Sequence, residues 1–340
     1  MDVNTPILVT GGTGLLGSYL LRLLVRRGFT DVRAVCRTDS PFDLVEDVKD
    51  RITWLEGDLT DILFVRDAAD GVERIYHCAA VVSYDSRDRA EMMRTNIEST
   101  ANLVNAALDF TVEKFLHVSS IAALGRRKNL PVITEKTLWE RSPMNSQYGI
   151  SKHLSEREVW RGAAEGLTVA VVNPSVIIGG GFWHKSSGRF FRNIARGFPF
   201  YPTGGSGFVD VRDVADFMLR LMHSDLHGER YILNAENISY RHFFNLTAAV
   251  VNGKKPFIRV NSLIRHLAWR VEWLRARLTG GRSTITKESA ENSARIWHFD
   301  NAKSLAAFPD FKYRAVKDTV RDTGDLFLQT KEKGYGVLPV

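Results

Sequence analysis

Short apolar runs alternate with longer amphipathic segments through the first half of the chain. Runs of four or five residues, rich in β-branched side chains and bounded by turn residues, are typical of strands buried on both faces of a parallel sheet. Such strands are expected at 7–10, 32–36, 52–56, 74–78, 114–118 and 168–172. Helices are expected between them at 14–27 and at 87–108, and a third helix carries residues 148 and 152 and runs to about 164. This alternation predicts an α/β fold with a doubly wound parallel sheet.

The alternation ends after residue 174. A triple glycine at 179–181 and an aromatic-rich stretch follow, and the sequence beyond 238 has mainly helical periodicity. We expect a smaller C-terminal substrate lobe that is interleaved with the first domain. The predicted division assigns 1–175 and about 208–225 to the nucleotide-binding domain, and 176–207 and 226–340 to the lobe.

A glycine-rich loop follows the first strand and opens the first helix. It reads Thr10-Gly11-Gly12-Thr13-Gly14-Leu15-Leu16-Gly17. Glycines permit a tight turn and close approach of the backbone to a pyrophosphate, and a helix amino end attracts the phosphates. The strand before it and the helix after it favour a Rossmann-type dinucleotide site over a purely structural turn. We expect cofactor contacts from Gly11, Thr13, Gly14, Leu15, Leu16 and Gly17.

The second strand bears on the choice of cofactor. Arg37 stands twenty residues after Gly17, where NAD-binding proteins usually have an acidic residue for the ribose. A guanidinium there suits a 2′-phosphate, so NADP is favoured, with NAD as the alternative if Asp39 performs the recognition. Asp58 and Leu59 follow the third strand where an adenine would lie. The alternative is that Asp58 caps the following helix.

Tyr148 and Lys152 form the candidate chemical pair. Residues four apart share a face of a helix, and a neighbouring ammonium favours the phenolate, which lowers the pKa of a tyrosine. Such a tyrosine can exchange a proton with an oxygen during carbonyl–alcohol interconversion. Taken alone, the spacing also fits an exposed helical pair.

Several motifs in order resemble the extended short-chain dehydrogenase/reductase superfamily, also described as the NAD-dependent epimerase/dehydratase family. They include the glycine loop, Asp58-Leu59, His77-Cys78-Ala79-Ala80, Asn96 with Ser99, Ser119-Ser120, Tyr148 with Lys152, Asn173-Pro174 and 208–215. Ser99 departs from the glycine that is common there, which a helix tolerates. Val32-Arg33-Ala34-Val35-Cys36-Arg37 is similar to dihydroflavonol reductases, and the region around 263–286 is similar to 3β-hydroxysteroid dehydrogenases.

The resemblance implies an NAD(P)H-dependent oxidoreductase with Ser120, Tyr148 and Lys152 as its catalytic set. Ser120 would polarise a carbonyl, Tyr148 would move the proton, and Lys152 would lower the tyrosine pKa and bind the nicotinamide ribose. Ser119 would support the strand end or touch the cofactor, and Asn96 would order the site. Further cofactor contacts are implied for Ala79, Ala80, Pro174 and Val176.

The segment in which the resemblance places the substrate pocket is rich in aromatic residues. Its aromatic residues are Phe182, Trp183, Phe190, Phe191, Phe198, Phe200 and Tyr201. An apolar carbonyl or alcohol substrate fits them, and core packing is expected for at least half. The segment 263–278 carries an apolar stripe at helical spacing among arginines. We expect it to pack on the lobe, with peripheral membrane contact as the alternative. The family resemblance also implies a homodimer.

Composition and residue spacing limit the partners, metal sites and locations that the chain can be expected to have. The 340 residues carry 46 Lys and Arg against 39 Asp and Glu, a net charge of +7, without a nucleic-acid motif, so no nucleic-acid partner is expected. The spacing of Cys36, Cys78 and the histidines predicts no metal site. No signal peptide is recognised, and a cytoplasmic location is expected. The rival functions are a nucleotide-sugar epimerase or dehydratase with tightly bound NAD, and a non-catalytic NADP-binding regulatory protein.

Overall fold

The computed structural model describes residues 2–126, 132–279 and 286–340. In this part of the chain, seven parallel strands form the main sheet in the order β10-β6-β5-β4-β1-β2-β3. The strands are β1 Ile7–Thr10, β2 Val32–Cys36, β3 Thr53–Glu56, β4 Arg74–His77, β5 Lys114–Val118, β6 Val169–Pro174 and β10 Glu229–Leu233. The strand order reverses beside β1, which is where doubly wound sheets bind ligands. The predicted Rossmann-type α/β fold is confirmed.

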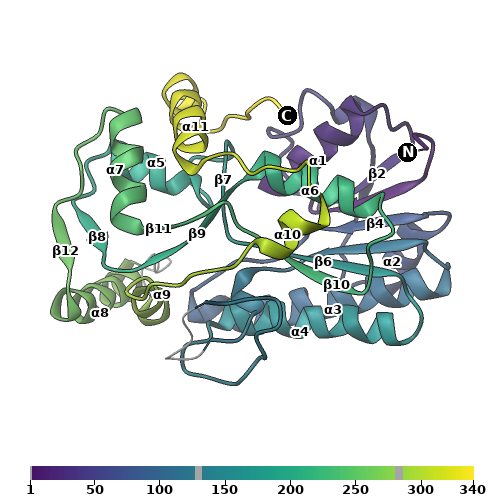
Figure 1. Cartoon of the computed structure of the whole chain (residues 1–340), viewed down its shortest axis with the longest axis horizontal. Helices are drawn as coiled ribbons and strands as arrows, with labels where there is room; N and C mark the ends of the chain where they lie inside the picture. The colour runs from purple at the N-terminus through teal and green to yellow at the C-terminus, as the bar shows by residue number, and fades with distance from the viewer. Residues whose placement is uncertain (1, 127–131, 280–285) are drawn as a thin grey trace.

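Helices cover both faces of this sheet (Figure 1). Ile7 and Val9 of β1 pack into the core beneath α1 (Leu15–Arg26) and α6 (Val211–Met222), whereas Leu8 faces the opposite core. That opposite core lies beneath α2 Ile62–Ala69, α3 Arg89–Asp109 and α4 Gln147–Ala164. Because side chains alternate along a strand, a run that is apolar throughout needs both layers. The short 3₁₀ helices are η1 Lys49–Arg51, η2 Ser86–Asp88 and η3 Ile121–Ala123.

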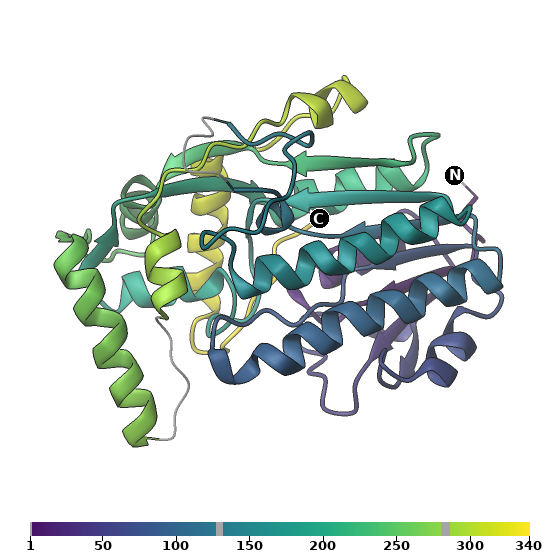
Figure 2. The same cartoon turned by 90° about the horizontal axis from the view of Figure 1, so that it is seen from below.

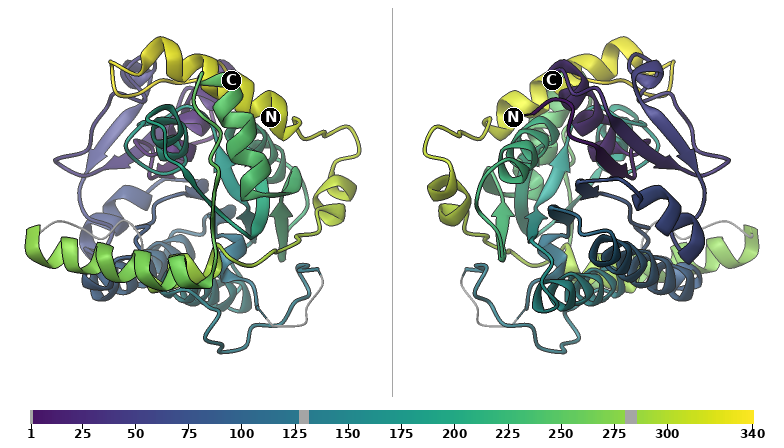
Figure 3. Two further views of the ribbon diagram at one scale, coloured as in Figure 1. Left: turned by 90° about the vertical axis from the view of Figure 1, so that its left-hand side faces the viewer. Right: turned by 90° about the vertical axis from the view of Figure 1, so that its right-hand side faces the viewer.

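A second lobe lies beside the carboxyl ends of β1 and β6 (Figures 1 and 3). Its strands are β7 Val176–Ile178, β9 Gly205–Asp210 and β11 Glu236–Ser239 in one sheet, and β8 Phe200–Pro202 with β12 Ile258–Val260 in another. Its helices are α5 Gly188–Ala195, α7 Tyr240–Val250, α8 Ser262–Thr279, α9 Lys287–Asn292, α10 Ala302–Ala307 and α11 Val316–Thr330. Phe208 stacks on Phe243 at 4.6 Å between ring centroids in the core of this lobe.

The two parts are interleaved in sequence. The strand β10, which the sequence division placed in the lobe, pairs with β6 and belongs to the main sheet. Segments assigned to the lobe also bond to the main domain. The Tyr19 hydroxyl of α1 donates to the Gly180 carbonyl and accepts from the Leu338 amide. In the residues described, no helix is long and apolar enough to cross a membrane.

Candidate functional site

The glycine loop forms a cradle at the carboxyl end of β1. Gly11 has a φ of +72°, and a Cβ atom there would lie 2.7 Å from the Ala79 amide nitrogen. A Cβ atom on Gly17 would lie 2.2 Å from the Gly11 carbonyl oxygen. The loop therefore requires both glycines to reach this shape. Within the described chain, α1 has no side-chain cap at Gly14 and no acidic residue in its first turn. Its amide groups suit a pyrophosphate.

The other loop residues expected to touch the cofactor have different environments. Leu16 is buried in the core beneath the sheet, whereas Leu15 and Thr13 are half-buried. Only the backbone of Leu16 therefore remains for the expected cofactor contact. Ala79 follows β4, and its amide nitrogen donates to Thr10 Oγ1 at 3.2 Å, which holds the two strand ends together. Pro174 ends β6 next to Val176 of β7.

Arg37 follows β2 at the edge of this cradle. Its side chain is 68% exposed, and its Nε atom lies 3.9 Å from the exposed carboxylate of Asp39. Ion pairs of this exposure contribute little, so either charge can meet a nucleotide. Asp58 accepts from the Thr60 amide and hydroxyl at 2.8 and 2.9 Å, which lowers its pKa. The alternative interpretation of Asp58 as a helix cap is wrong, because Asp61 caps α2.

Tyr148 and Ser120 come together where η3 packs against the first turn of α4. The helix starts there because Ser146 Oγ accepts from the Gly149 amide at 2.9 Å. Ser120 caps η3 by accepting from the Ala122 amide at 3.1 Å, and its side chain lies close enough to the Tyr148 hydroxyl to affect the pKa of that phenol. Lys152 lies one turn farther along α4. The three residues predicted as a catalytic set are thus near one another.

The predicted direction of the tyrosine pKa is wrong in this structure. Burial raises the pKa of Tyr148, and the nearby Ser120 side chain acts to lower it by less. The expectation rested on a fully charged neighbour, but Lys152 is itself only 2% exposed. Burial lowers the pKa of Lys152 to about 8, although the nearby Glu156 carboxylate acts to raise it.

Two buried histidines lie near Lys152 of α4, and sequence analysis assigned them no role. His117 Nε2 is 3.4 Å from Lys152 Nζ. His77 bonds to Thr10 Oγ1 at 2.7 Å and to Thr100 Oγ1 at 3.0 Å. Burial lowers the pKa of His77 to about 3 and that of His117 well below its usual value, so both rings are neutral at pH 7. No group of three or more metal-ligating side chains occurs in the ranges that the structure describes.

Glu156 organises the support of the site, and sequence analysis did not identify it. Its buried carboxylate accepts from Ser119 Oγ at 2.6 Å, from Asn173 Nδ2 at 3.0 Å and from Trp160 Nε1 at 3.1 Å. Arg230 lies 3.3 Å away. Asn173 Nδ2 also donates to the Ser120 carbonyl at 3.1 Å. Its spacing in the sequence could have identified it, because Glu156 follows Lys152 by one helical turn.

Asn96 joins the loop after β4 to α4. Its side-chain oxygen accepts from the Val81 amide at 2.7 Å. Its nitrogen donates to the Val81 carbonyl at 3.0 Å and to Ser151 Oγ at 3.1 Å. This geometry fits the ordering role expected of Asn96, because the loop it holds contains Ala79 and Ala80. Ser99 lies buried within α3 and donates to the Thr95 carbonyl.

The aromatic residues divide between core and substrate side. Trp183 and Phe191 are buried in the lobe core, and Phe190 and Tyr201 pack against it, so four of the seven are core residues. Tyr84, which the sequence did not identify, has its ring 6.2 Å from that of Tyr148. Its side chain is 44% exposed, yet the surrounding protein raises the pKa of its phenol.

Comparison with known proteins agrees with this geometry. The model of the NAD dependent epimerase/dehydratase family matches residues 7–234. Sterol demethylase protein B of Methylococcus capsulatus is 36% identical over 234 residues, which cover 68% of this chain and 70% of that protein. Cinnamoyl-CoA reductase 1 of Petunia hybrida is 26% identical over 69% of this chain and 74% of its own.

The crystal structure of gox2253 has a TM-score of 0.81 and 30% identity, and the match covers 96% of this chain and 98% of that one. The matched family segment includes the glycine loop, Ser120, Tyr148 and Lys152. The chain therefore belongs to the NAD-dependent epimerase/dehydratase family of extended short-chain dehydrogenases/reductases and is an NAD(P)-dependent oxidoreductase.

Proposed function

We propose that this protein reduces the carbonyl of a small apolar substrate with NADPH, or oxidises the matching alcohol. The observation that carries the proposal is the approach of the Ser120 side chain to the Tyr148 phenol one turn above Lys152, at the same sheet edge as the glycine cradle. A phenol that lies beside a hydroxyl is placed to share a substrate oxygen with it. The bound cofactor supplies the hydride.

Each residue then has a separate task. The hydroxyl of Ser120 donates to the substrate oxygen, and Tyr148 gives its proton to that oxygen as negative charge develops there. Lys152, whose pKa of about 8 leaves it mostly protonated at pH 7, stabilises the phenolate that forms and binds the nicotinamide ribose. The ring of Tyr84 lines the substrate side. Asn173 positions Ser120 by bonding its carbonyl oxygen.

The loop 11–17 would hold the pyrophosphate, and Arg37 would hold the 2′-phosphate of NADP. Ala79, Ala80, Pro174 and Val176 would line the nicotinamide half. Asp58 would accept from the adenine amino group, next to Leu59, because its carboxylate is exposed and its pKa is lowered. The exposed position of Asp39 beside Arg37 makes NAD the competing ligand.

An apolar substrate is proposed from two observations. The relatives are named for a sterol and for cinnamoyl-CoA, both of which carry extended apolar groups. In this chain Phe182, Phe198 and Phe200 are half-buried around the lobe and stay outside its core cluster. We also propose a homodimer through α3 and α4, which lie side by side on the outside of the molecule (Figure 2).

The family also contains epimerases, which makes a nucleotide-sugar epimerase with tightly bound NAD the second candidate. The two candidates differ in whether the cofactor leaves. A reductase releases its oxidised cofactor in each turnover, whereas an epimerase regenerates it in place. Purified protein that retains NAD through gel filtration and interconverts nucleotide sugars would favour the epimerase.

The deciding experiment titrates NADPH and NADH against the purified chain and then follows nicotinamide absorbance with ketones, aldehydes, sterols and nucleotide sugars. We expect NADPH to bind more tightly and to be consumed with an apolar carbonyl compound. Arg37→Ala should remove the preference for NADPH without weakening NADH. Cofactor binding without turnover of any substrate would support the non-catalytic alternative.

A further inference from the structure

Helix α8 exposes its apolar side chains. The exposed residues are Leu263 (80%), Leu267 (64%), Val271 (57%) and Leu278 (77%). Spacings of four, four and seven residues place them in one stripe along the helix. The segment packs on the lobe as expected, through contacts with α9 and β12, but its apolar stripe is not the face that packs.

The opposite side of α8 is polar and faces the protein. The Glu272 side chain is only 14% exposed, and the Arg265 Nε and Trp269 Nε1 atoms are buried. Of the neighbouring elements, α9 and β12 contact α8. Figures 2 and 3 show the helix beside the lobe with its far end projecting beyond the body. The usual orientation of an amphipathic helix is therefore inverted here.

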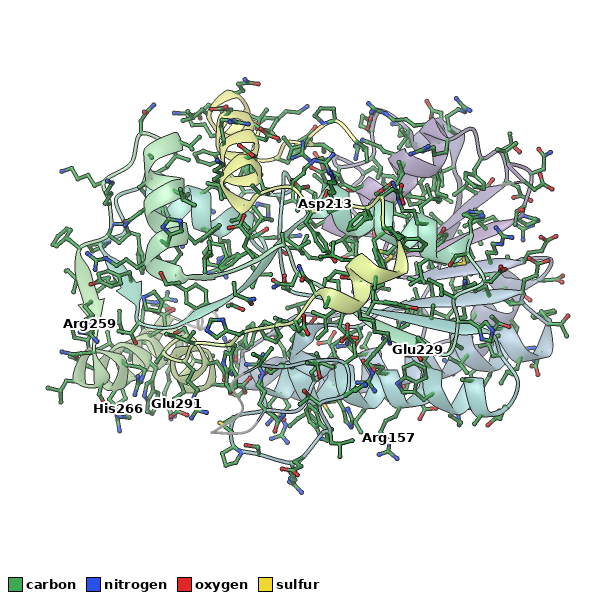
Figure 4. All side chains as sticks on the ribbon, in the orientation of Figure 1. Arg157, Asp213, Glu229, Arg259, His266 and Glu291 are labelled. Carbon is green, nitrogen blue, oxygen red and sulfur yellow. The ribbon has the colours of Figure 1, made fainter. Side chains whose placement is uncertain are left out.

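Positive charge accompanies the exposed stripe. Within α8 the exposed basic residues are His266, Arg270, Arg275 and Arg277, and Arg275 pairs with the single acid of the helix, Glu272. The preceding segment adds the exposed residues Lys254, Lys255 and Arg259 and an apolar side chain, Phe257, that is 74% exposed. Arg259 and His266 lie at the same end of the molecule (Figure 4).

We propose that α8 and residues 254–259 bind the surface of an anionic phospholipid bilayer. The leucine stripe enters the boundary between headgroups and acyl chains, and the arginines contact lipid phosphates. Guanidinium groups pair well with phosphate oxygens, and the surface charge of the bilayer draws the helix to it. The proposal is independent of the proposed reaction, because its readout is lipid binding.

The distribution of charge favours a bilayer over a second copy of the chain. A twofold contact centred on α8 would bring the same basic segment of each copy together. Like charges that face one another in an interface oppose association. A bilayer containing phosphatidylglycerol presents the opposite charge and an apolar interior to the same surface.

The test is flotation of the full chain with vesicles of phosphatidylcholine, with and without phosphatidylglycerol. We expect binding to the mixed vesicles, weakened by added salt, and Leu263→Gln/Leu267→Gln should lower the partition coefficient by at least about tenfold. The matched control is Ile62→Gln/Leu63→Gln on α2, whose side chains are 60% and 73% exposed. This control should bind like wild type.

The charge contribution has its own pair of variants. Arg270→Gln should lower binding to mixed vesicles by about fivefold. Arg157→Gln, on an exposed face of α4, should leave binding unchanged. Circular dichroism melting shows that each variant is folded.

Two results would overturn the proposal. One is equal binding by wild type and Leu263→Gln/Leu267→Gln. The other is a wild type that binds neither kind of vesicle. If the double variant then has a smaller oligomeric mass than wild type, α8 would be assigned to contact between copies.

Discussion

Replacing Glu156 by glutamine should both destabilise the protein and disturb the part of α4 that carries Lys152. The buried carboxylate accepts three hydrogen bonds and pairs with Arg230. Breaking one partner of a buried ion pair costs about 3–5 kcal/mol. Because the Arg230 side chain is 27% exposed and can be hydrated, we expect about 3 kcal/mol. For a chain of 340 residues that lowers Tm by about 4 °C.

Differential scanning calorimetry at neutral pH measures this change, and Glu158→Gln is the matched control on the same helix. Glu158 pairs with Arg161 at 3.0 Å, with both side chains about one-third exposed, so its loss should cost less than about 0.5 kcal/mol. Glu156 also raises the pKa of Lys152, so Glu156→Gln should move the basic limit of activity to lower pH. A Tm within about 1 °C of wild type would refute the assigned role of Glu156.

Three further changes test the site. Tyr148→Phe should remove turnover by at least about a hundredfold while cofactor affinity, measured by fluorescence titration, stays within twofold; full activity would disprove the proton-transfer role. Gly17→Ala should weaken NADPH binding by more than about tenfold, because its Cβ would meet the Gly11 carbonyl at 2.2 Å; unchanged affinity would contradict the cradle. Lys152→Met should abolish activity yet raise Tm at pH 7, since wild type holds this ammonium buried at a pKa of about 8 against the usual 10.5. The folded wild type thus resists protonation of Lys152. The gain in stability of Lys152→Met should therefore be full below about pH 8 and fade toward pH 10.5, as thermal melts across this pH range would measure.

Local pattern predicted the main sheet well, because each of its strands is an apolar run that must be covered on both faces. The runs at 7–10 and 114–118 are strands with these bounds in the structure. The place of β10 in the main sheet was not predicted. The pattern of Arg230-Tyr231-Ile232-Leu233 indicates a strand, but it does not indicate that this strand pairs with β6. The orientation of α8 was also missed, because helical spacing shows that a stripe exists but not which way it faces.

The catalytic pair shows the same division between spacing and environment. The four-residue interval placed Tyr148 and Lys152 on neighbouring turns of one helix face, as the structure has them. Their pKa values depend on how much water reaches them, which is decided by residues distant in sequence, such as His117 beneath the lysine. Burial opposes charge on both groups: it favours the neutral phenol of Tyr148 and the neutral amine of Lys152. A charge that is costly in the resting protein becomes useful when an opposite charge forms beside it. In the proposed reaction the buried ammonium would therefore gain most when Tyr148 loses its proton, because the phenolate is absent before proton transfer begins.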